Sequence, residues 1–228
     1  MPDVRYLRIR FANSLRDYEL PYFRSAVIEA TEREHDRFHN HTADSGSIYR
    51  YPLIQYKIIR GCAALVCLGE AVDDIHFLLR RPDLRLRIGA REDAFRIDEL
   101  CINHHPVQAG ERMLAYRIRH WLPLNTQNYA RFQALPTAAA REAELERILT
   151  GNLLNFAKAV GYWADQPIRV QIHRIRDSGF LRFKDSPHLG FDLDFSANMG
   201  LPPCVGLGKG AGVGYGVVEG SGQLLTMH

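Results

Sequence analysis

Apolar and polar side chains alternate strictly in the first stretch of the chain. Leu7, Ile9 and Phe11 fall on one face, and Arg8 and Arg10 fall on the other. A period of two is typical of a β-strand that has one buried and one exposed face. The pattern therefore predicts that the fold begins with a strand whose outer face is basic.

The rest of the first half continues with helical and strand periodicities. A proline suited to the first turn of a helix precedes apolar residues spaced by four and three. The predicted elements are a strand at 4–11, a helix from 21 to between 34 and 38, strands at 51–60 and 62–68, a helix at 70–81, and strands at 84–89 and 95–103. Strand, helix, strand, strand, helix, strand is the βαββαβ order of the ferredoxin-like fold.

The second half repeats this order in a shorter form. The predicted elements are a strand at 112–122, helical segments over 137–160 with Gly151 as a point of interruption, and strands at 168–175, 180–184, 189–195 and 213–219. Between Ala197 and Gly206 there is little room for a second helix. We therefore predict an α+β protein of two tandem ferredoxin-like (RRM-like) halves, 1–105 and 106–228. The second half is abbreviated, and the two are joined near 104–111.

Composition agrees with an ordinary folded globule, since 46% of the residues are hydrophobic and 24% are charged. The charged N-terminus differs from the apolar core of a signal peptide, and the longest apolar run, 62–68, is too short to cross a bilayer. The four cysteines form no CxxC pair, which favours a reducing compartment. We expect a cytoplasmic protein with no membrane partner.

The basic residues are almost all arginines. The net charge is only +3, but four of the 29 basic residues are Lys and the others are Arg. Arg5, Arg8, Arg10 and Arg16 lie close together, and a guanidinium fits phosphate bidentately and stacks on bases. The pattern favours a polyanionic partner, although a GC-rich genome would enrich Arg in the same way.

A glycine-rich segment, GLGKGAGVGYG, lies near the C-terminus. Its glycines occupy every second position: 206, 208, 210, 212, 214 and 216. Too few residues follow for a dinucleotide-binding unit, and Gly210 stands where a Walker A loop needs Ser or Thr after the lysine. Three alternatives remain: a loop whose amides and Lys209 face a phosphate backbone, a tightly packed connection without a helix, and a flexible tail.

Together these features resemble a known family. A segment of the form GLGKGAGVGYGVV closing a pair of ferredoxin-like folds, with IYRYPLIQYK at 48–57, is similar to the RAMP superfamily of CRISPR-associated proteins. Within it, the chain resembles the endoribonuclease that cuts precursor CRISPR RNA inside each repeat. The resemblance implies CRISPR repeat RNA as substrate and no cofactor. It leaves open a CRISPR effector complex as the recipient of the RNA, and a homodimer.

Three histidines, His35, His39 and His41, follow the first predicted helix. An imidazole exchanges protons near neutrality, which suits the attack of an RNA 2′-OH on the adjacent phosphate. The resemblance places catalysis at the end of this helix, so that His39 and His41 become the acid and base candidates and Tyr49 the helper. His35 is expected to be an ordinary surface residue.

Two rival functions are consistent with parts of the same sequence. A metal-dependent hydrolase would use His35 and His39, four residues apart, but this spacing without glutamate or cysteine is a weak zinc signal. We therefore expect no metal. A non-catalytic RNA-binding subunit would have the same fold and no need for the histidines.

Several further residues are candidates for holding RNA. Arg117 and Arg119 share a strand face with Trp121, as a surface that binds phosphate and stacks bases would. His120 is expected on the opposite face, partly buried, and the histidines at 104–105 in the connection between the halves. Lys57 is either a phosphate contact or a solvated strand lysine. The complete set of RNA-binding candidates is Lys57, Arg117, Arg119, Gly206, Gly208, Lys209, Gly210, Gly212 and Gly214.

Overall fold

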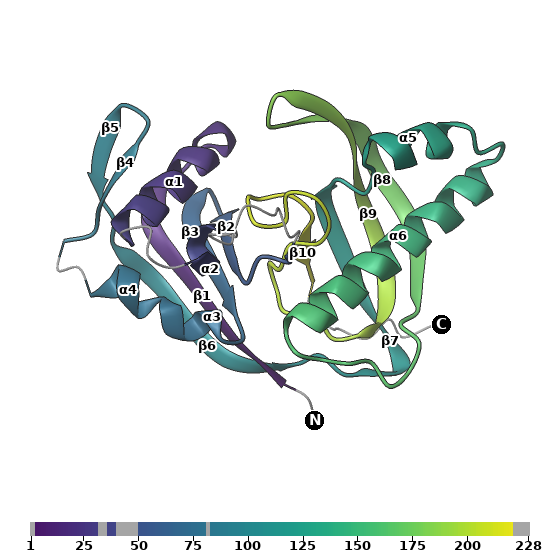
Figure 1. Cartoon of the computed structure of the whole chain (residues 1–228), viewed down its shortest axis with the longest axis horizontal. Helices are drawn as coiled ribbons and strands as arrows, with labels where there is room; N and C mark the ends of the chain where they lie inside the picture. The colour runs from purple at the N-terminus through teal and green to yellow at the C-terminus, as the bar shows by residue number, and fades with distance from the viewer. Residues whose placement is uncertain (1–2, 32–35, 40–49, 81–82, 221–228) are drawn as a thin grey trace. The chain divides into compact units, whose positions relative to one another are not determined.

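The computed structural model describes residues 3–31, 36–39, 50–80 and 83–220, and they form two compact units (Figure 1). The N-terminal unit comprises Val4–His105 together with Gly212–Gly214. Of the described residues, the C-terminal unit comprises Asp3, Pro106–Ala211 and Tyr215–Gly220. The glycine-rich segment therefore contributes residues to both units.

The N-terminal unit has the predicted ferredoxin-like order. Its elements are β1 (Asp3–Ser14), a 3-10 turn (Asp17–Glu19), α1 (Leu20–Ala30), α2 (Asp36–His39), β2 (Ile54–Ile59), β3 (Cys62–Leu68), α3 (Ala71–Asp74), α4 (His76–Leu79), β4 (Arg85–Ile88), β5 (Arg91–Ala94) and β6 (Ile97–Pro106). Four strands form one sheet in the order β2-β3-β1-β6. The order is that of a βαββαβ unit in which β6 is the fourth strand.

The helix predicted from 21 to between 34 and 38 ends at Ala30 as α1, and two further details of this unit differ from the sequence prediction. The helix expected at 70–81 is two short helices, α3 and α4. The strand expected at 84–89 is one arm of a separate hairpin, β4–β5, whose second arm was not predicted. The residues of β5 are REDA, which carry no apolar alternation from which a strand could be recognised.

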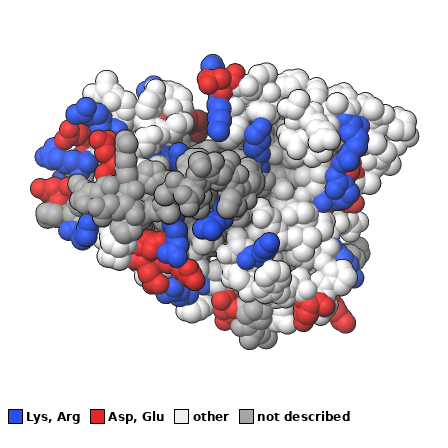
Figure 2. Space-filling view, viewed as in Figure 1, with Lys and Arg blue, Asp and Glu red and all other residues white. Residues whose placement is uncertain are grey.

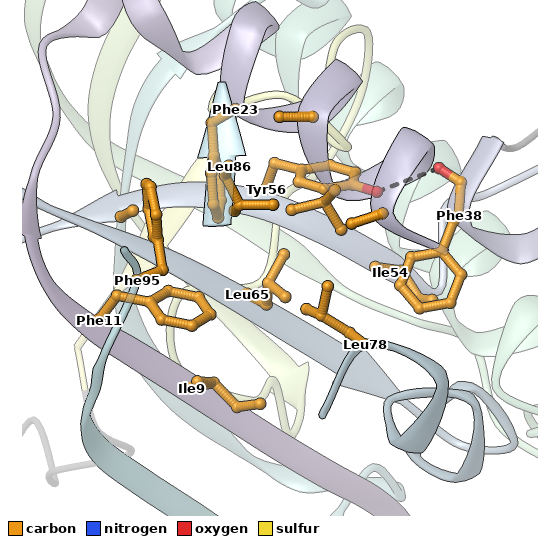
Figure 3. Packing of buried hydrophobic residues seen from close by; sticks show 14 of the residues in the cluster. Ile9, Phe11, Phe23, Phe38, Ile54, Tyr56, Leu65, Leu78, Leu86 and Phe95 are labelled. Atoms are coloured by element: carbon orange, nitrogen blue, oxygen red, sulfur yellow. Dashed lines mark hydrogen bonds between the residues drawn. The ribbon is translucent and has the colours of Figure 1, made fainter. Parts of the chain in front are cut away.

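The core of the N-terminal unit lies between its sheet and α1, with the β4–β5 hairpin adding to it (Figure 3). Phe11 of β1 contacts the rings of Phe23 and Phe95 edge-on, with centroids 6.0 and 5.5 Å apart. Phe23 also stacks on Phe95 at 5.6 Å. Ile9 pairs with Leu65 across β1 and β3, so the predicted apolar face of the first strand is the buried one.

The arginines on the opposite face of β1 are held by acids. Arg8 pairs with Glu99, and Arg10 pairs with Glu99 at 3.3 Å and with Asp98 at 2.5 Å. The Arg8 and Arg10 guanidiniums hold the pKa of Glu99 below its usual range. The basic face predicted for this strand is thus largely neutralised by β6, which weakens the argument for a polyanion there.

The C-terminal unit has the same topology in the predicted abbreviated form. Its elements are β7 (Ala109–Trp121), α5 (Thr126–Gln133), α6 (Ala138–Ala159), β8 (Val170–Phe183), β9 (Ser186–Met199) and β10 (Val217–Glu219). The strand order β10-β7-β9-β8 is again ferredoxin-like, with the glycine-rich segment where the second helix would be. α6 lies along one face of this sheet (Figure 1).

Several elements of this unit differ in extent from the prediction, and the strand expected at 213–219 is only β10, Val217–Glu219. α6 runs unbroken through Gly151, because the buried Leu149 and Leu153 on either side outweigh a glycine cost of about 1 kcal/mol. α5 was not predicted, since its residues are mostly polar. The strands expected at 168–175 and 180–184 are one strand, β8, and β9 extends on both sides of the predicted 189–195.

The junction between the halves is shorter than predicted. β6 continues to Pro106 and β7 begins at Ala109, so the histidines at 104–105 belong to a strand and not to a connection. The strand β6 therefore extends beyond the point where the apolar pattern ends.

A backbone irregularity at the end of β7 reverses two predicted faces. The register shifts between Ile118 and Trp121, and His120 has a φ of 50°. Trp121 is consequently fully buried on the core face, and its indole N–H donates to Asn152 Oδ1 at 2.9 Å. His120 is exposed. A stacking surface that includes Trp121 is therefore wrong, and so is a partly buried His120.

All four cysteines are free thiols. Among the helices of the described residues, none is long and apolar enough to cross a membrane.

Candidate functional site

The helix that ends at the candidate catalytic histidine is anchored at two consecutive residues. In α2, the Phe38 ring is 1% exposed and lies in the core, and its carbonyl accepts a hydrogen bond from the Tyr56 hydroxyl at 3.2 Å (Figure 3). The preceding Arg37 pairs with Glu70 at 2.7 Å and with Asp74 at 2.9 Å. The backbone of His39, the last residue of α2, follows directly from these two fixed points.

The described residues end at this point of the site. His41 and Tyr49 lie outside them, and of His39 only the backbone in α2 is described. His35 also lies outside them. The assignment of the three catalytic candidates therefore rests on the sequence and on the anchored helix α2, which ends at His39.

The segment that resembled the family, 48–57, has a structural explanation in its described part. Gln55, fully buried, donates through Nε2 to the Tyr51 hydroxyl at 2.9 Å and to the Pro52 carbonyl at 3.1 Å. Burial raises the pKa of the Tyr51 and Tyr56 phenols far above the usual value. Both phenols therefore serve as neutral hydrogen-bonding groups and not as proton carriers near neutrality.

Lys57 is not the solvated strand lysine considered above. It pairs with Ala64 across β2 and β3, and it is 1% exposed. A phosphate contact by Lys57 therefore requires a ligand that reaches this buried position.

One part of the glycine-rich segment is joined to the N-terminal unit. The Tyr56 N–H donates to the Gly212 carbonyl at 2.9 Å, and Val213 forms a parallel bridge with Tyr56. Gly214 has a φ of +88°, and a Cβ there would lie 2.6 Å from Leu20 of α1. Glycine is thus required at this position for both backbone conformation and space.

The flanking parts are bonded within the C-terminal unit. Amides donate to carbonyls from Leu207 to Gly216 at 2.9 Å, from Ala211 to Gly208 at 3.4 Å, from Tyr215 to Gly210 at 3.3 Å and from Gly216 to His120 at 3.1 Å. Gly206 bridges to Val217. The segment is a tightly packed connection, so the flexible-tail alternative is wrong. These particular amides are already used and do not face a ligand.

Lys209 lies beside the end of the β8–β9 hairpin. Its Nζ is 3.2 Å from His188 Nε2 and 5.5 Å from the centre of the Phe183 ring. A Cβ on Gly210 would lie within 2.9 Å of the Phe183 and Tyr215 rings, so glycine allows this close approach. Burial, with a smaller contribution from the Lys184 ammonium, lowers the pKa of Lys209.

Arg117 and Arg119 project from the face of β7 opposite the buried Ile118, and both are paired with acids. Arg117 Nε lies 3.0 Å from Asp194, and Arg119 Nε lies 3.0 Å from Glu219. Asp194 also receives Arg176, whose Nη2 is 2.7 Å away. The Arg176 and Arg117 guanidiniums lower the pKa of Asp194. Arg176 was missed from the sequence because the bulges in β8 obscure its alternation.

Charge alone does not locate a binding surface. On the face shown in Figure 2, basic and acidic side chains are interspersed and form no continuous basic patch. Within the described residues no group of three or more His, Cys, Asp or Glu side chains is arranged to hold a metal ion. Of the two histidines of the metal alternative, His35 lies outside the described residues and only the backbone of His39 is described.

Known structures share this fold over nearly the whole chain. A crystal structure of Cas6b superposes with a TM-score of 0.82 at 23% identity, covering 95% of this chain and 99% of that chain. A structure of the CRISPR RNA processing endoribonuclease Cas6b superposes with a TM-score of 0.69 at 22% identity, covering 95% and 98%. The CRISPR endoribonuclease Cse3 bound to a 19 nt RNA gives a TM-score of 0.50 at 15% identity, again covering 95% and 98%.

Sequence comparison assigns both halves to one family. An uncharacterized protein of Methanocaldococcus jannaschii is 29% identical over 110 residues, which are 48% of this chain and 74% of that protein. The profile of the Cas6b N-terminal domain matches residues 2–106, and that of the Cas6b C-terminal domain matches residues 108–221. Because the two profiles follow one another over almost the entire sequence, the chain belongs to the Cas6b family.

Proposed function

We propose that this chain is a metal-independent endoribonuclease that cleaves CRISPR repeat RNA and so generates guide RNAs. Membership of the Cas6b family supports the reaction class, because a structure with this fold is described as a CRISPR RNA processing endoribonuclease. The single structural observation that carries the proposal is the fixed position of α2, which ends at His39.

The proposed chemistry uses the nucleophile that RNA itself provides. One imidazole, of His39 or His41, removes the proton of the 2′-OH, and the 2′-oxygen attacks the adjacent phosphorus. The bond from phosphorus to the 5′-oxygen breaks, and the other imidazole protonates the leaving oxygen. Tyr49 donates a hydrogen bond to the phosphorane oxygens. The products are a 2′,3′-cyclic phosphate and a 5′-OH.

Substrate binding is assigned to the remaining candidates. Arg117 and Arg119 would contact phosphates by exchanging their intramolecular carboxylate partners for the RNA backbone. Lys209, within the glycine-rich segment, would contact a further phosphate. The glycines at 206, 208, 210, 212 and 214 would allow the RNA backbone to approach the protein backbone closely. Lys57 would contact only an RNA group that enters its buried position.

The test is cleavage of the source organism's own CRISPR repeat RNA in the presence of EDTA. Parallel reactions use RNA with a single 2′-deoxy nucleotide at each candidate site. We expect cleavage in EDTA that one deoxy substitution blocks, since that substitution removes the nucleophile. Loss of cleavage in EDTA would instead support the metal-dependent hydrolase.

Variants identify the proton carriers. We expect His39→Ala and His41→Ala each to lower the single-turnover rate by about 100-fold or more, as loss of a general acid or base does. Tyr49→Phe should give a smaller loss. His104→Ala, which changes an exposed histidine of β6, is the matched control. Tight binding of the repeat by the unaltered protein without cleavage would show a non-catalytic RNA-binding subunit.

A further inference from the structure

Two basic side chains face each other in the C-terminal unit without a described acidic partner. Lys209 Nζ lies 3.2 Å from His188 Nε2 and 3.5 Å from His188 Nδ1. Among the ion pairs of the described residues, none includes His188, Lys184 or Lys209. A lysine ammonium approaches an imidazole nitrogen this closely only when that nitrogen carries no proton and accepts the hydrogen bond.

The surroundings of this pair concentrate positive charge and contain an aromatic ring. Lys209 and Lys184 both lie over the Phe183 ring, at 5.5 and 5.9 Å from its centre. Tyr215 contacts the same ring edge-on at 5.3 Å, and its hydroxyl donates to the Arg182 carbonyl. The groups around the His188 imidazole are therefore held in place by ring packing before any ligand binds.

The hairpin turn contributes to this arrangement at a conformational cost. Lys184, the first residue of the two-residue turn between β8 and β9, has a φ of 56°. Asn or Gly is the usual choice for such a turn position. One of the chain's four lysines stands here instead, and it brings a second ammonium to Phe183.

The electrostatics of the pair suit an anionic ligand. Burial, and then the Lys209 ammonium, lower the pKa of His188. Lys209 is the charged group that acts on His188, and the other charged residues at this end of the hairpin are Lys184, Arg182 and Asp185, of which Asp185 lies 4.0 Å from the Arg182 guanidinium. A phosphate bound beside Lys209 and His188 would favour the protonated imidazole and allow both side chains to donate hydrogen bonds to its oxygens.

We propose that His188 and Lys209 together bind one phosphate of the RNA, and that His188 takes up a proton from solvent when they do. This inference rests on the proposed function, because it assigns a phosphate contact for the same substrate. It adds His188 as a phosphate-binding residue. It also gives the RNA affinity a pH dependence that is separate from the pH dependence due to the catalytic histidines.

The experiment measures affinity for repeat RNA that carries a 2′-deoxy nucleotide at the scissile position and is not cleaved. Fluorescence anisotropy is recorded from pH 5.5 to 8.5 at several salt concentrations. We expect the affinity of the unaltered protein to exceed that of His188→Gln by about tenfold at pH 6, and this advantage to shrink toward pH 8 as His188 loses its proton. His39 and His41 are present in both proteins, so the difference isolates His188.

Two lysine variants complete the test. Lys209→Met should lower affinity at all pH values and reduce the salt dependence by about one phosphate contact. Lys158→Met, which removes an exposed lysine at the end of α6, should change neither. Thermal unfolding of each variant establishes that it is folded.

The failure of this inference can be distinguished from the failure of the proposed function. If His188→Gln binds with the affinity and pH dependence of the unaltered protein, and cleavage of normal repeat RNA proceeds in both, the phosphate site is wrong and the endoribonuclease stands. If the unaltered protein neither binds nor cleaves the repeat, both are wrong.

Discussion

Tyr56 makes two polar contacts that join different parts of the N-terminal unit. Its backbone N–H donates to the Gly212 carbonyl, and its side-chain hydroxyl donates to the Phe38 carbonyl next to His39. Its ring packs edge-on against Phe23 at 6.0 Å. One side chain thus supports the end of the helix that carries the catalytic candidate, and we assign it as a positioning residue.

The substitution Tyr56→Phe tests this assignment, because it removes only the hydroxyl group. The change leaves the ring in the core but removes the donor to Phe38, at an expected cost of about 1–3 kcal/mol in stability. We expect the cleavage rate at saturating RNA to fall about tenfold, while RNA affinity stays within about twofold. Single-turnover kinetics and anisotropy measure the two quantities separately.

The C-terminal unit offers a matched control for that variant. Tyr116 is also buried, and its hydroxyl also donates to a backbone carbonyl, that of Met199 at 3.1 Å. Tyr116→Phe should cost similar stability without slowing cleavage. Equal losses of rate in the two variants would mean that Tyr56 acts only through general stability.

At the scale of elements, a single carboxylate connects the two helices of the C-terminal unit. Glu144 of α6 pairs with Arg147 of the same helix at 2.8 Å and with Arg131 of α5. The hydrogen bonds from Arg147 and Arg131 lower the pKa of Glu144 from its ordinary 4.5 to about 2. The ring of Phe132 holds α5 to the sheet by an edge-on contact with Phe191 at 6.0 Å.

The lowered pKa predicts how this connection responds to acid. A carboxylate whose pKa is lower in the folded state stabilises the fold fully above its unfolded pKa, and the stabilisation is lost as the pH falls through the folded pKa. We expect Glu144→Gln to lower the free energy of unfolding by about 1 kcal/mol at pH 7, given the exposure of both arginines. Urea unfolding should show this difference unchanged down to about pH 4.5 and shrinking toward pH 2. A difference that does not vary with pH would assign the effect to packing.

At the scale of the whole molecule, the last part of the chain belongs to two units. Gly212–Gly214 is part of the N-terminal unit, while Pro106–Ala211 and the residues from Tyr215 onward are part of the C-terminal unit. The strand β2 lies at the edge of its sheet, and the hydrogen bond from the Tyr56 N–H to the Gly212 carbonyl satisfies one backbone donor of that edge. The N-terminal unit is therefore completed only when residues more than 100 positions away have been added.

A substitution at Gly214 tests whether the glycine-rich segment is needed to complete the N-terminal unit. Valine is strained at a φ of +88° and would contact Leu20, so we expect Gly214→Val to displace the segment at a cost above about 1 kcal/mol. Hydrogen exchange of the Tyr56 amide should then become at least tenfold faster. Gly110→Val is the control, because a side chain there meets open space in a strand. Unchanged protection of the Tyr56 amide in Gly214→Val would contradict the prediction.

The sequence determined those features that depend on neighbours along the chain. The alternation of Leu7, Ile9 and Phe11 was sufficient to predict the buried face of β1. The order of strands and helices was sufficient to predict the ferredoxin-like fold of both halves. The missing second helix of the C-terminal half was also predictable from the few residues between β9 and the glycines. The roles of His39, His41 and Tyr49 stay predictions.

Tertiary structure decided what depends on contacts between distant residues. A bulge turned Trp121 into the core, acids on β6 neutralised the arginines of β1, and packing carried α6 through Gly151. The anchoring of α2 by Tyr56, and the meeting of Lys209 with His188, join residues 18 and 21 positions apart. Periodicity reports only whether a position is buried. Which partner a buried or charged group meets depends on the strand register and the path of the loops, and these form only when the whole chain has folded.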